Sequence, residues 1–147
     1  MINPFDPRAA LLAKHAQHVA LIHFPIALFI VGVAFDALGA WTKRELFASA
    51  AFLNLSAAAL TVPFAVFTGI LAWKLQLEGQ RLKGILLYHL LAAVVSAVII
   101  LVSWWVHFLA RRRGAGLGVW RFAFELVGIL TVVLTGHLGG YLSGANF

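Results

Sequence analysis

Six histidines are the residues of this sequence best able to do chemistry, because neutral imidazole is a common ligand of haem iron, zinc and copper. They are His15, His18, His23, His89, His107 and His137. Cysteine is absent from the sequence. Disulfides, iron–sulfur clusters, thiolate zinc sites and covalently attached c-type haem are therefore excluded, since all of them need thiols.

The elements that must position these histidines are apolar helices. The 147 residues are 63% hydrophobic and 11% charged, with a mean hydropathy of +0.97, whereas a soluble domain is about 45–50% apolar and about 25% charged. Crossing a bilayer takes about 20 helical residues. Four runs are long enough, at about 19–40, 46–73, 84–110 and 119–142. The sequence predicts an all-α membrane protein: a single domain over residues 1–147, folded as an antiparallel four-helix transmembrane bundle with a short N-terminal interfacial segment at about 9–20.

The basic residues lie in short links between these runs. We call side A the face with both termini and the link between spans two and three, and side B the face with the other two links. The net charge is +6, but clusters beside apolar spans are typical of lipid-headgroup anchors, so no nucleic-acid partner is expected. Side B carries six basic residues and side A five. The positive-inside rule therefore puts side B in the cytoplasm and favours side A, with both termini, on the periplasmic or exterior face.

Three histidines from three spans are expected at one depth near side A. His23, His89 and His137 each lie about five residues from that end, or roughly 6–9 Å below the surface at the helical rise per residue. Polar groups at such depth are costly and usually mark a site. His18 lies closer to the surface and is a further candidate. His18 and His23 differ by about 140° around their helix, so they cannot easily ligate one iron from one side. A kink at Pro25 could turn His23 inward.

Haem b, one or two per chain, is the metal centre that this layer favours. Carboxylates for a di-iron site are nearly absent near side A, where only Asp6 and Glu78 occur, outside the apolar core. The surroundings are aromatic and contain small residues that suit a flat macrocycle, although such glycines also serve close helix packing. These residues are Phe24, Phe64, Phe67, Tyr88, Gly69, Gly136, Gly139 and Gly140.

A second polar cluster is expected near side B. His107 is eighteen residues after His89, hence on the same helix face about 27 Å away. No second histidine or methionine lies near side B, so a haem with two axial protein ligands is excluded there within one chain. Asp36, Asn54 and Glu125 are the other polar residues at this depth. They could form a proton or quinone site with His107, or structural pairs with Lys43, Arg44 or Arg121.

Two short motifs carry a resemblance to a known family. The segment from His18 to Leu28, HVALIHFPIAL, resembles the opening of a bacterial membrane family catalogued as domain of unknown function 2231, and GHLGG at Gly136 to Gly140 matches an element near its end. Asp36 also fits, whereas Val19 departs from the proline often found after the first histidine. The resemblance covers most of the chain. It implies four spans and a histidine-rich site with suspected haem binding, for which it supports His18, His23 and His137, and His89 less firmly.

Three hypotheses about function follow. The first is a small b-type cytochrome-like electron-transfer subunit, with His23, His89 and His137 as leading haem ligands, His18 as an alternative, and a respiratory or photosynthetic redox complex as its setting. The second is a copper or zinc protein that uses the same histidines. The third is a cofactor-free structural or assembly subunit of a membrane complex, whose histidines make interhelical hydrogen bonds. A catalytic role is less expected than an electron-transfer or accessory one.

Overall fold

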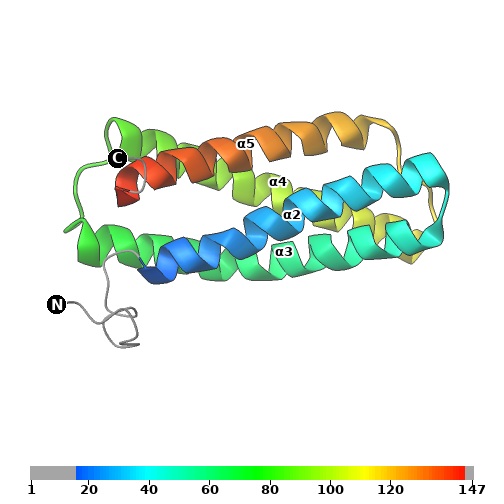
Figure 1. Cartoon of the computed structure of the whole chain (residues 1–147), viewed down its shortest axis with the longest axis horizontal. Helices are drawn as coiled ribbons and strands as arrows, with labels where there is room; N and C mark the ends of the chain where they lie inside the picture. Colours follow the sequence, from blue (N-terminus) through cyan, green and yellow to red (C-terminus); the bar gives the residue numbers. More distant parts are fainter. Residues whose placement is uncertain (1–15, 145–147) are drawn as a thin grey trace.

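The computed structural model describes residues 16–144, with the backbone alone for Ala16 and Gln76. Its helices are α2 (Ala16–Thr42), α3 (Glu45–Leu71), α4 (Ile85–Arg113) and α5 (Trp120–Ser143), and a short π-helix, η1 (Ala72–Gln76), extends α3 (Figure 1). The spans begin and end within about three residues of the expected positions. Most of the predicted interfacial segment at 9–20 lies outside the described residues, and its last five residues are the first turns of α2.

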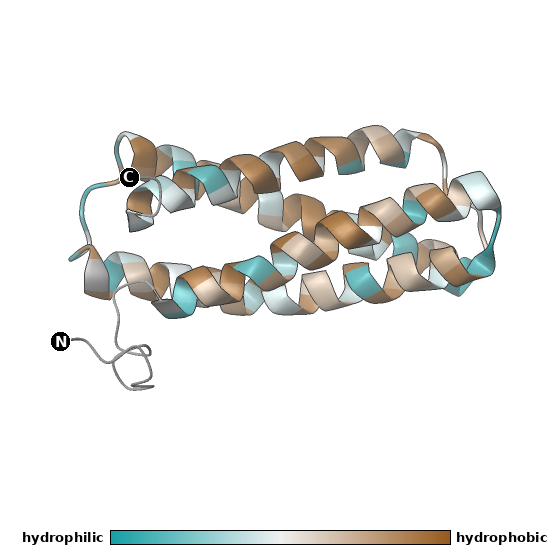
Figure 2. Cartoon of the chain, viewed as in Figure 1, coloured by the Kyte–Doolittle hydropathy of each residue, from teal (hydrophilic) through white to brown (hydrophobic). Residues whose placement is uncertain are grey.

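All four helices have the length and composition of membrane spans. Between 24 and 31 residues of each form an apolar stretch long enough to cross a bilayer. Apolar residues cover the helices on every visible face, whereas hydrophilic residues gather in the links and at a few interior positions (Figure 2). Within the described part of the chain there is no strand. The chain is thus an all-helical, multi-pass membrane protein whose outer surface contacts lipid.

The helices form two hairpins in a ring. α2 packs most extensively on α3, and α4 packs on α5; α3 also contacts α4, and α2 contacts α5. α2 and α4 are therefore diagonal neighbours across the bundle. Successive helices run in opposite directions (Figure 1), as their short links require.

The tight packing lies in the middle of the bundle and in the half next to side B. The buried apolar core consists of Phe29, Val33, Leu55, Ala58, Ala59, Val62, Ile99, Ile100 and Val132. Glycines allow close approach there: a Cβ on Gly39 would lie 3.1 Å from the backbone nitrogen of Ala48, and one on Gly128 would lie 2.7 Å from Phe29 and Ile99. Small residues at helix contacts are the usual means of packing in lipid, where no hydrophobic force joins helices.

The half of the bundle next to side A is packed far more loosely. Among its described residues, Pro25 and Ala72 are buried, and so are Val62 and Ser96 toward the middle of the bundle. The α2–α3 hairpin and the α4–α5 hairpin lie apart at this end of the molecule (Figure 1). The indole Nε1 of Trp73 donates a hydrogen bond to the carbonyl of Gln80 at 2.9 Å, which ties η1 to the link between the hairpins. The histidines predicted as ligands lie in this open half.

Candidate functional sites

His18 and His89 occupy equivalent places in the two hairpins. Nδ1 of His18 on α2 lies 3.1 Å from the hydroxyl of Thr68 on α3, and Nδ1 of His89 on α4 donates to the Thr135 carbonyl on α5 at 3.1 Å. Each ring also covers a glycine of the partner helix, since a Cβ on Gly69 or Gly139 would lie 3.0 or 3.1 Å from the imidazole Cε1. These two glycines therefore make room for imidazole rings.

His23 and His137 are more exposed than His18 and His89. Nδ1 of His23 donates to the carbonyl of Val19 in its own helix. α2 continues through Pro25, so His23 keeps its helical position and is not buried by a kink. The ring of His137 packs edge-on against Tyr141, with 5.2 Å between ring centroids. His18 and His89 make hydrogen bonds to neighbouring helices, whereas the hydrogen bond of His23 lies within its own helix.

Among the described residues, no three histidines of side A gather closely enough to share one small metal ion. Within residues 16–144, the structure brings together one group of three ligand atoms from His, Asp and Glu within 4.8 Å of one another, and it is Asp36, His107 and Glu125. The four aromatic residues expected around a haem, namely Phe24, Phe64, Phe67 and Tyr88, are all exposed, at 57–63%. A compact site of three histidines for copper or zinc is therefore not seen within residues 16–144.

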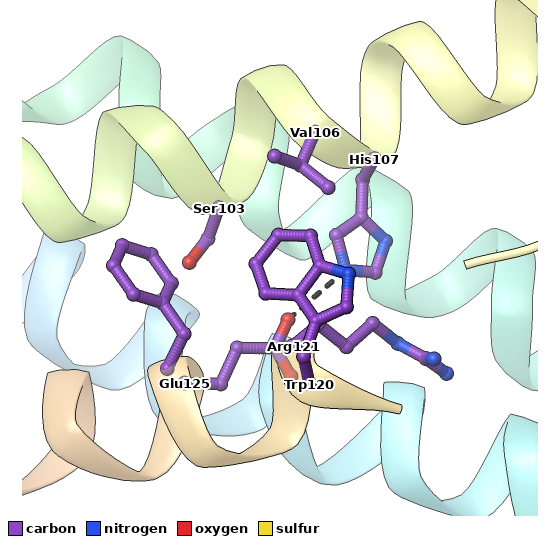
Figure 3. Close-up of a pocket in the computed structure, with 7 residues that line it drawn as sticks. Ser103, Val106, His107, Trp120, Arg121 and Glu125 are labelled. Atoms are coloured by element: carbon purple, nitrogen blue, oxygen red, sulfur yellow. Dashed lines mark hydrogen bonds and ion pairs between the residues drawn. The ribbon is translucent and has the colours of Figure 1, made fainter. Parts of the chain in front are cut away.

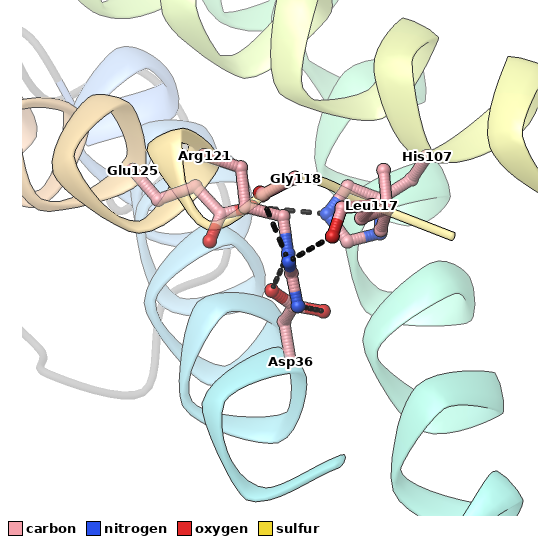
Figure 4. A network of polar contacts seen from close by, with 6 residues as sticks. All are labelled: Asp36, His107, Leu117, Gly118, Arg121 and Glu125. Atoms are coloured by element: carbon pink, nitrogen blue, oxygen red, sulfur yellow. Dashed lines mark hydrogen bonds and ion pairs between the residues drawn. The ribbon is translucent and has the colours of Figure 1, made fainter. Parts of the chain in front are cut away.

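The polar cluster near side B is buried and joins three helices (Figure 4). The Arg121 Nε of α5 donates to Oδ2 of Asp36 on α2 at 2.6 Å, and a second guanidinium nitrogen lies 3.4 Å from Oδ1. Arg121 also donates to the carbonyls of Leu117 and Gly118. Beside this pair, Nε2 of His107 on α4 lies 3.0 Å from Oε1 of Glu125 on α5. We call these four residues the side B cluster: Asp36, His107, Arg121 and Glu125, each at most 8% exposed.

One predicted member of this cluster lies elsewhere, and one residue was missed. Asn54 donates to the carbonyl of Ala50 in its own helix at 2.9 Å, so it takes no part in the cluster. Ser103 was not predicted, yet its buried hydroxyl faces Glu125 across a small space (Figure 3). The spacing of Ser96, Ser103 and His107 by seven and four residues places all three on one face of α4, which is the signal that could have identified Ser103.

The chain was compared with protein-family models, with curated proteins and with solved structures. The model of the family described as "Predicted membrane protein (DUF2231)" matches residues 14–145. The search of curated proteins finds no match, and neither does the search of solved structures. Because the match spans nearly the whole chain, including both histidine motifs and the side B cluster, this protein belongs to the DUF2231 family of predicted membrane proteins.

Proposed function

We propose that this protein is a small b-type cytochrome-like subunit that carries electrons through a haem held between the two hairpins near side A. His89 on α4 and His23 on α2 are the proposed axial ligands, with His137 and His18 as the other candidates. Haem iron with two imidazole ligands has no open position, so it supplies one-electron transfer rather than oxygen binding. The protein would hold the two imidazoles in place and surround the haem with apolar side chains.

The observation that carries this proposal is the tautomer of two imidazoles. A carbonyl oxygen only accepts hydrogen bonds, so the contacts with Val19 and Thr135 require a proton on Nδ1 of His23 and of His89. In a neutral ring, Nε2 then keeps its lone pair. Metal-bound histidines are oriented in this way, with the second nitrogen donating to a carbonyl or carboxylate.

The positions of the helices also suit a group bound from two sides. His23 and His89 belong to diagonal helices and to different hairpins. The side A half has few buried residues and many exposed apolar ones, such as Phe64, Phe67 and Leu91 at 54–62%. A large apolar ring placed there would cover this surface and join the hairpins, and its binding would stabilise the assembled bundle.

We also propose an orientation and a setting. Arg111, Arg112 and Arg113 end α4 at side B, and such a cluster next to a span favours the cytoplasmic face. Arg121, which we counted with them, is buried against Asp36, so the orientation depends mainly on the triple arginine. The termini and the proposed haem would then face the periplasm of a bacterial inner membrane. The apolar side A surface would meet other subunits of a respiratory or photosynthetic redox complex.

Replacing His89 with Gln should remove the haem and leave the fold intact. Glutamine still offers an N–H to the Thr135 carbonyl but does not replace imidazole as a haem ligand. We expect the purified wild-type chain, made in haem-supplied cells, to show a reduced-minus-oxidised haem spectrum that the H89Q variant loses. The matched control is His107→Gln, the same change on the same helix, which should keep the spectrum. A wild-type chain without haem, or an H89Q variant with normal haem content, would contradict the proposal.

A second variant should displace the His89 ring without removing it. A Cβ on Gly139 would lie 3.1 Å from Cε1 of His89, so Gly139→Val should push the imidazole out of place. Haem content should fall at least several-fold, as orientation of a ligand commonly matters by tenfold or more. Gly136→Val is the control, because a Cβ there meets only Ile26 at 3.8 Å. Equal haem content in the two variants would show that this contact does not position a ligand.

A cofactor-free assembly subunit is the second candidate, and one observation favours it. His18 and His89 each make a hydrogen bond that joins two helices, as the histidines of a purely structural bundle would. In that case the apolar surface of side A would contact partner helices instead of haem. The H89Q variant separates the two functions, because it preserves the interhelical hydrogen bond and removes the ligand.

A further inference from the structure

The charges of the side B cluster leave one negative charge without a counter-charge. Asp36 and Arg121 neutralise each other through two contacts between guanidinium and carboxylate. Glu125, 1% exposed, hydrogen-bonds His107, which is 6% exposed, and one of its carboxylate oxygens lies within 4.8 Å of a carboxylate oxygen of Asp36. An uncompensated ion at such depth is very costly. The pair reaches net zero charge when it holds one additional proton, as an ionised Glu–imidazolium pair or as a carboxylic acid beside a neutral ring.

We propose that His107 and Glu125 form a proton-binding site that takes up and releases one proton through an aqueous opening on side B. The proton comes from water or buffer at side B and is carried on an N–H of His107 or an O–H of Glu125. The hydrogen bond of 3.0 Å between the two side chains lets either one hold it. This inference does not depend on haem, because the cluster lies at the opposite end of the helices.

A cavity of about 320 Å³ links this pair to the surface (Figure 4 shows the polar side chains at its inner end). Its inner wall includes the buried residues Asp36, His107 and Arg121, and its outer wall includes Glu45 and Arg111, whose side chains are 83% and 51% exposed. The cavity therefore runs from the side B surface to the imidazole. A volume of this size holds several waters, which are sufficient to carry a proton.

A second, smaller space lies on the inner side of the pair (Figure 3). Its volume is about 10 Å³, and Ser103, His107 and Glu125 line it. The Ser103 hydroxyl and Oε2 of Glu125 are both buried here, and neither has a hydrogen-bond partner among the described residues. A space of this volume fits one water molecule. Such a water would hydrogen-bond both groups and stabilise Glu125 in either protonation state.

A proton suits the cluster better than a metal ion does. The ligand atoms of Asp36, His107 and Glu125 lie close enough together for a divalent cation. However, both oxygens of Asp36 already face the Arg121 guanidinium, and a divalent ion would have to sit beside that fixed positive charge. One proton restores neutrality, whereas a divalent ion would leave a net positive charge in the bundle.

The charged groups around the pair come from all four helices. Asp36 faces it from α2, Arg121 from its own helix α5, and Glu45 and Arg111 line the outer part of the cavity from α3 and α4. Glu45 and Arg111 approach each other to 3.9 Å. Being exposed, they are screened by water and salt. The fixed Asp36–Arg121 pair is thus the main electrostatic neighbour of the proton site.

The first experiment measures the proton directly, with the full chain in lipid nanodiscs. Infrared spectra follow the Glu125 carboxyl, and nitrogen NMR follows His107, between about pH 5 and about pH 9. We expect both groups to change at the same midpoint, because coupled sites titrate as a pair. Glu125→Gln should abolish the carboxyl signal and uncouple His107 from the joint change, whereas Glu45→Gln should leave both unchanged.

Two outcomes would overturn the proposal. One is a wild-type chain in which neither group changes protonation across this range. The other is a His107 midpoint that is the same in wild type and in the E125Q variant. If E125Q fails to fold, the joint wild-type titration remains decisive, together with His107→Gln, which should remove the joint step while Glu125 stays in place.

The second experiment tests the route through the cavity, using the absence of natural cysteines. Gly116 lines the cavity, and a Cβ there meets nothing within 4 Å, so Gly116→Cys is tolerated and can carry a bulky thiol reagent. After mixing with D₂O, exchange of the Glu125 carboxyl proton should slow about tenfold or more in the labelled variant, since the water path is blocked. Lys83→Cys with the same label, at side A, is the control. Equal exchange rates in the two labelled variants would refute the side B route.

Discussion

Replacing Arg121 with Met should be the most destabilising single change at side B. It leaves the Asp36 carboxylate, 5% exposed, without its counter-ion inside the bundle. Removing one partner of a buried ion pair costs about 3–5 kcal/mol. We expect the free energy of unfolding, measured by SDS titration in mixed micelles with tryptophan fluorescence, to fall by about that amount. The exposed Arg113→Met is the control and should change it by less than about 0.5 kcal/mol.

A double variant distinguishes the loss of the Asp36–Arg121 ion pair from the cost of leaving the Asp36 carboxylate unpaired. Asp36→Leu combined with R121M removes both ions and leaves apolar side chains of similar size. Replacing a whole buried pair in this way is often neutral or stabilising, so most of the loss in R121M should be recovered. If the double variant is as unstable as R121M, the cost comes from the lost hydrogen bonds of Arg121 to Leu117 and Gly118, and not from the charge of Asp36.

Among the variants that add a single methyl group, Gly128→Ala should lower the free energy of unfolding most. Its Cβ would lie 2.7 Å from Cζ of Phe29 and from Cγ2 of Ile99, where α2, α4 and α5 meet. Phe29 is fully buried. Overpacking of this kind costs about 1–3 kcal/mol. The same SDS titration should therefore show a clear loss of stability.

Gly136→Ala is the matched control on the same helix. Its nearest neighbour is Ile26, at an ordinary contact distance of 3.8 Å, and alanine is a better helix former than glycine by up to about 1 kcal/mol. Gly136→Ala should therefore leave the stability unchanged or raise it. Similar losses in both variants would mean that glycine at these positions serves a purpose other than close packing.

The four spans could be predicted from the sequence because length and hydropathy are local properties. The end of the bundle near which each histidine lies could also be predicted from the sequence, because successive helices joined by short links run in opposite directions. The rotation of each helix did not follow. Apolar residues occur on every face of the helices that is visible in Figure 2, so periodicity does not tell which face turns inward. His23 was expected to point into the bundle, yet it is exposed and hydrogen-bonded to its own helix.

Pairings across the bundle were predictable only in part. Asp36, His107 and Glu125 were grouped because they lie at one depth, and Arg121 was one of three expected partners for them. The choice of Arg121, and not Lys43 or Arg44, depends on the packing of α2 against α5, which the sequence does not encode locally. The separation of the hairpins at side A was not predicted either. It results from side-chain packing between helices, whereas the sequence gives only the positions of the spans.

The Asp36–Arg121 contact has a consequence for the order of biogenesis. Its two residues are 85 positions apart, and a chain made from the N-terminus releases α2 and α3 into the bilayer well before α5 exists. During that interval the first hairpin holds this acidic group without the guanidinium that it contacts in the folded chain. Arrival of α5 supplies that guanidinium, so we expect docking of the second hairpin to stabilise Asp36 in its buried position.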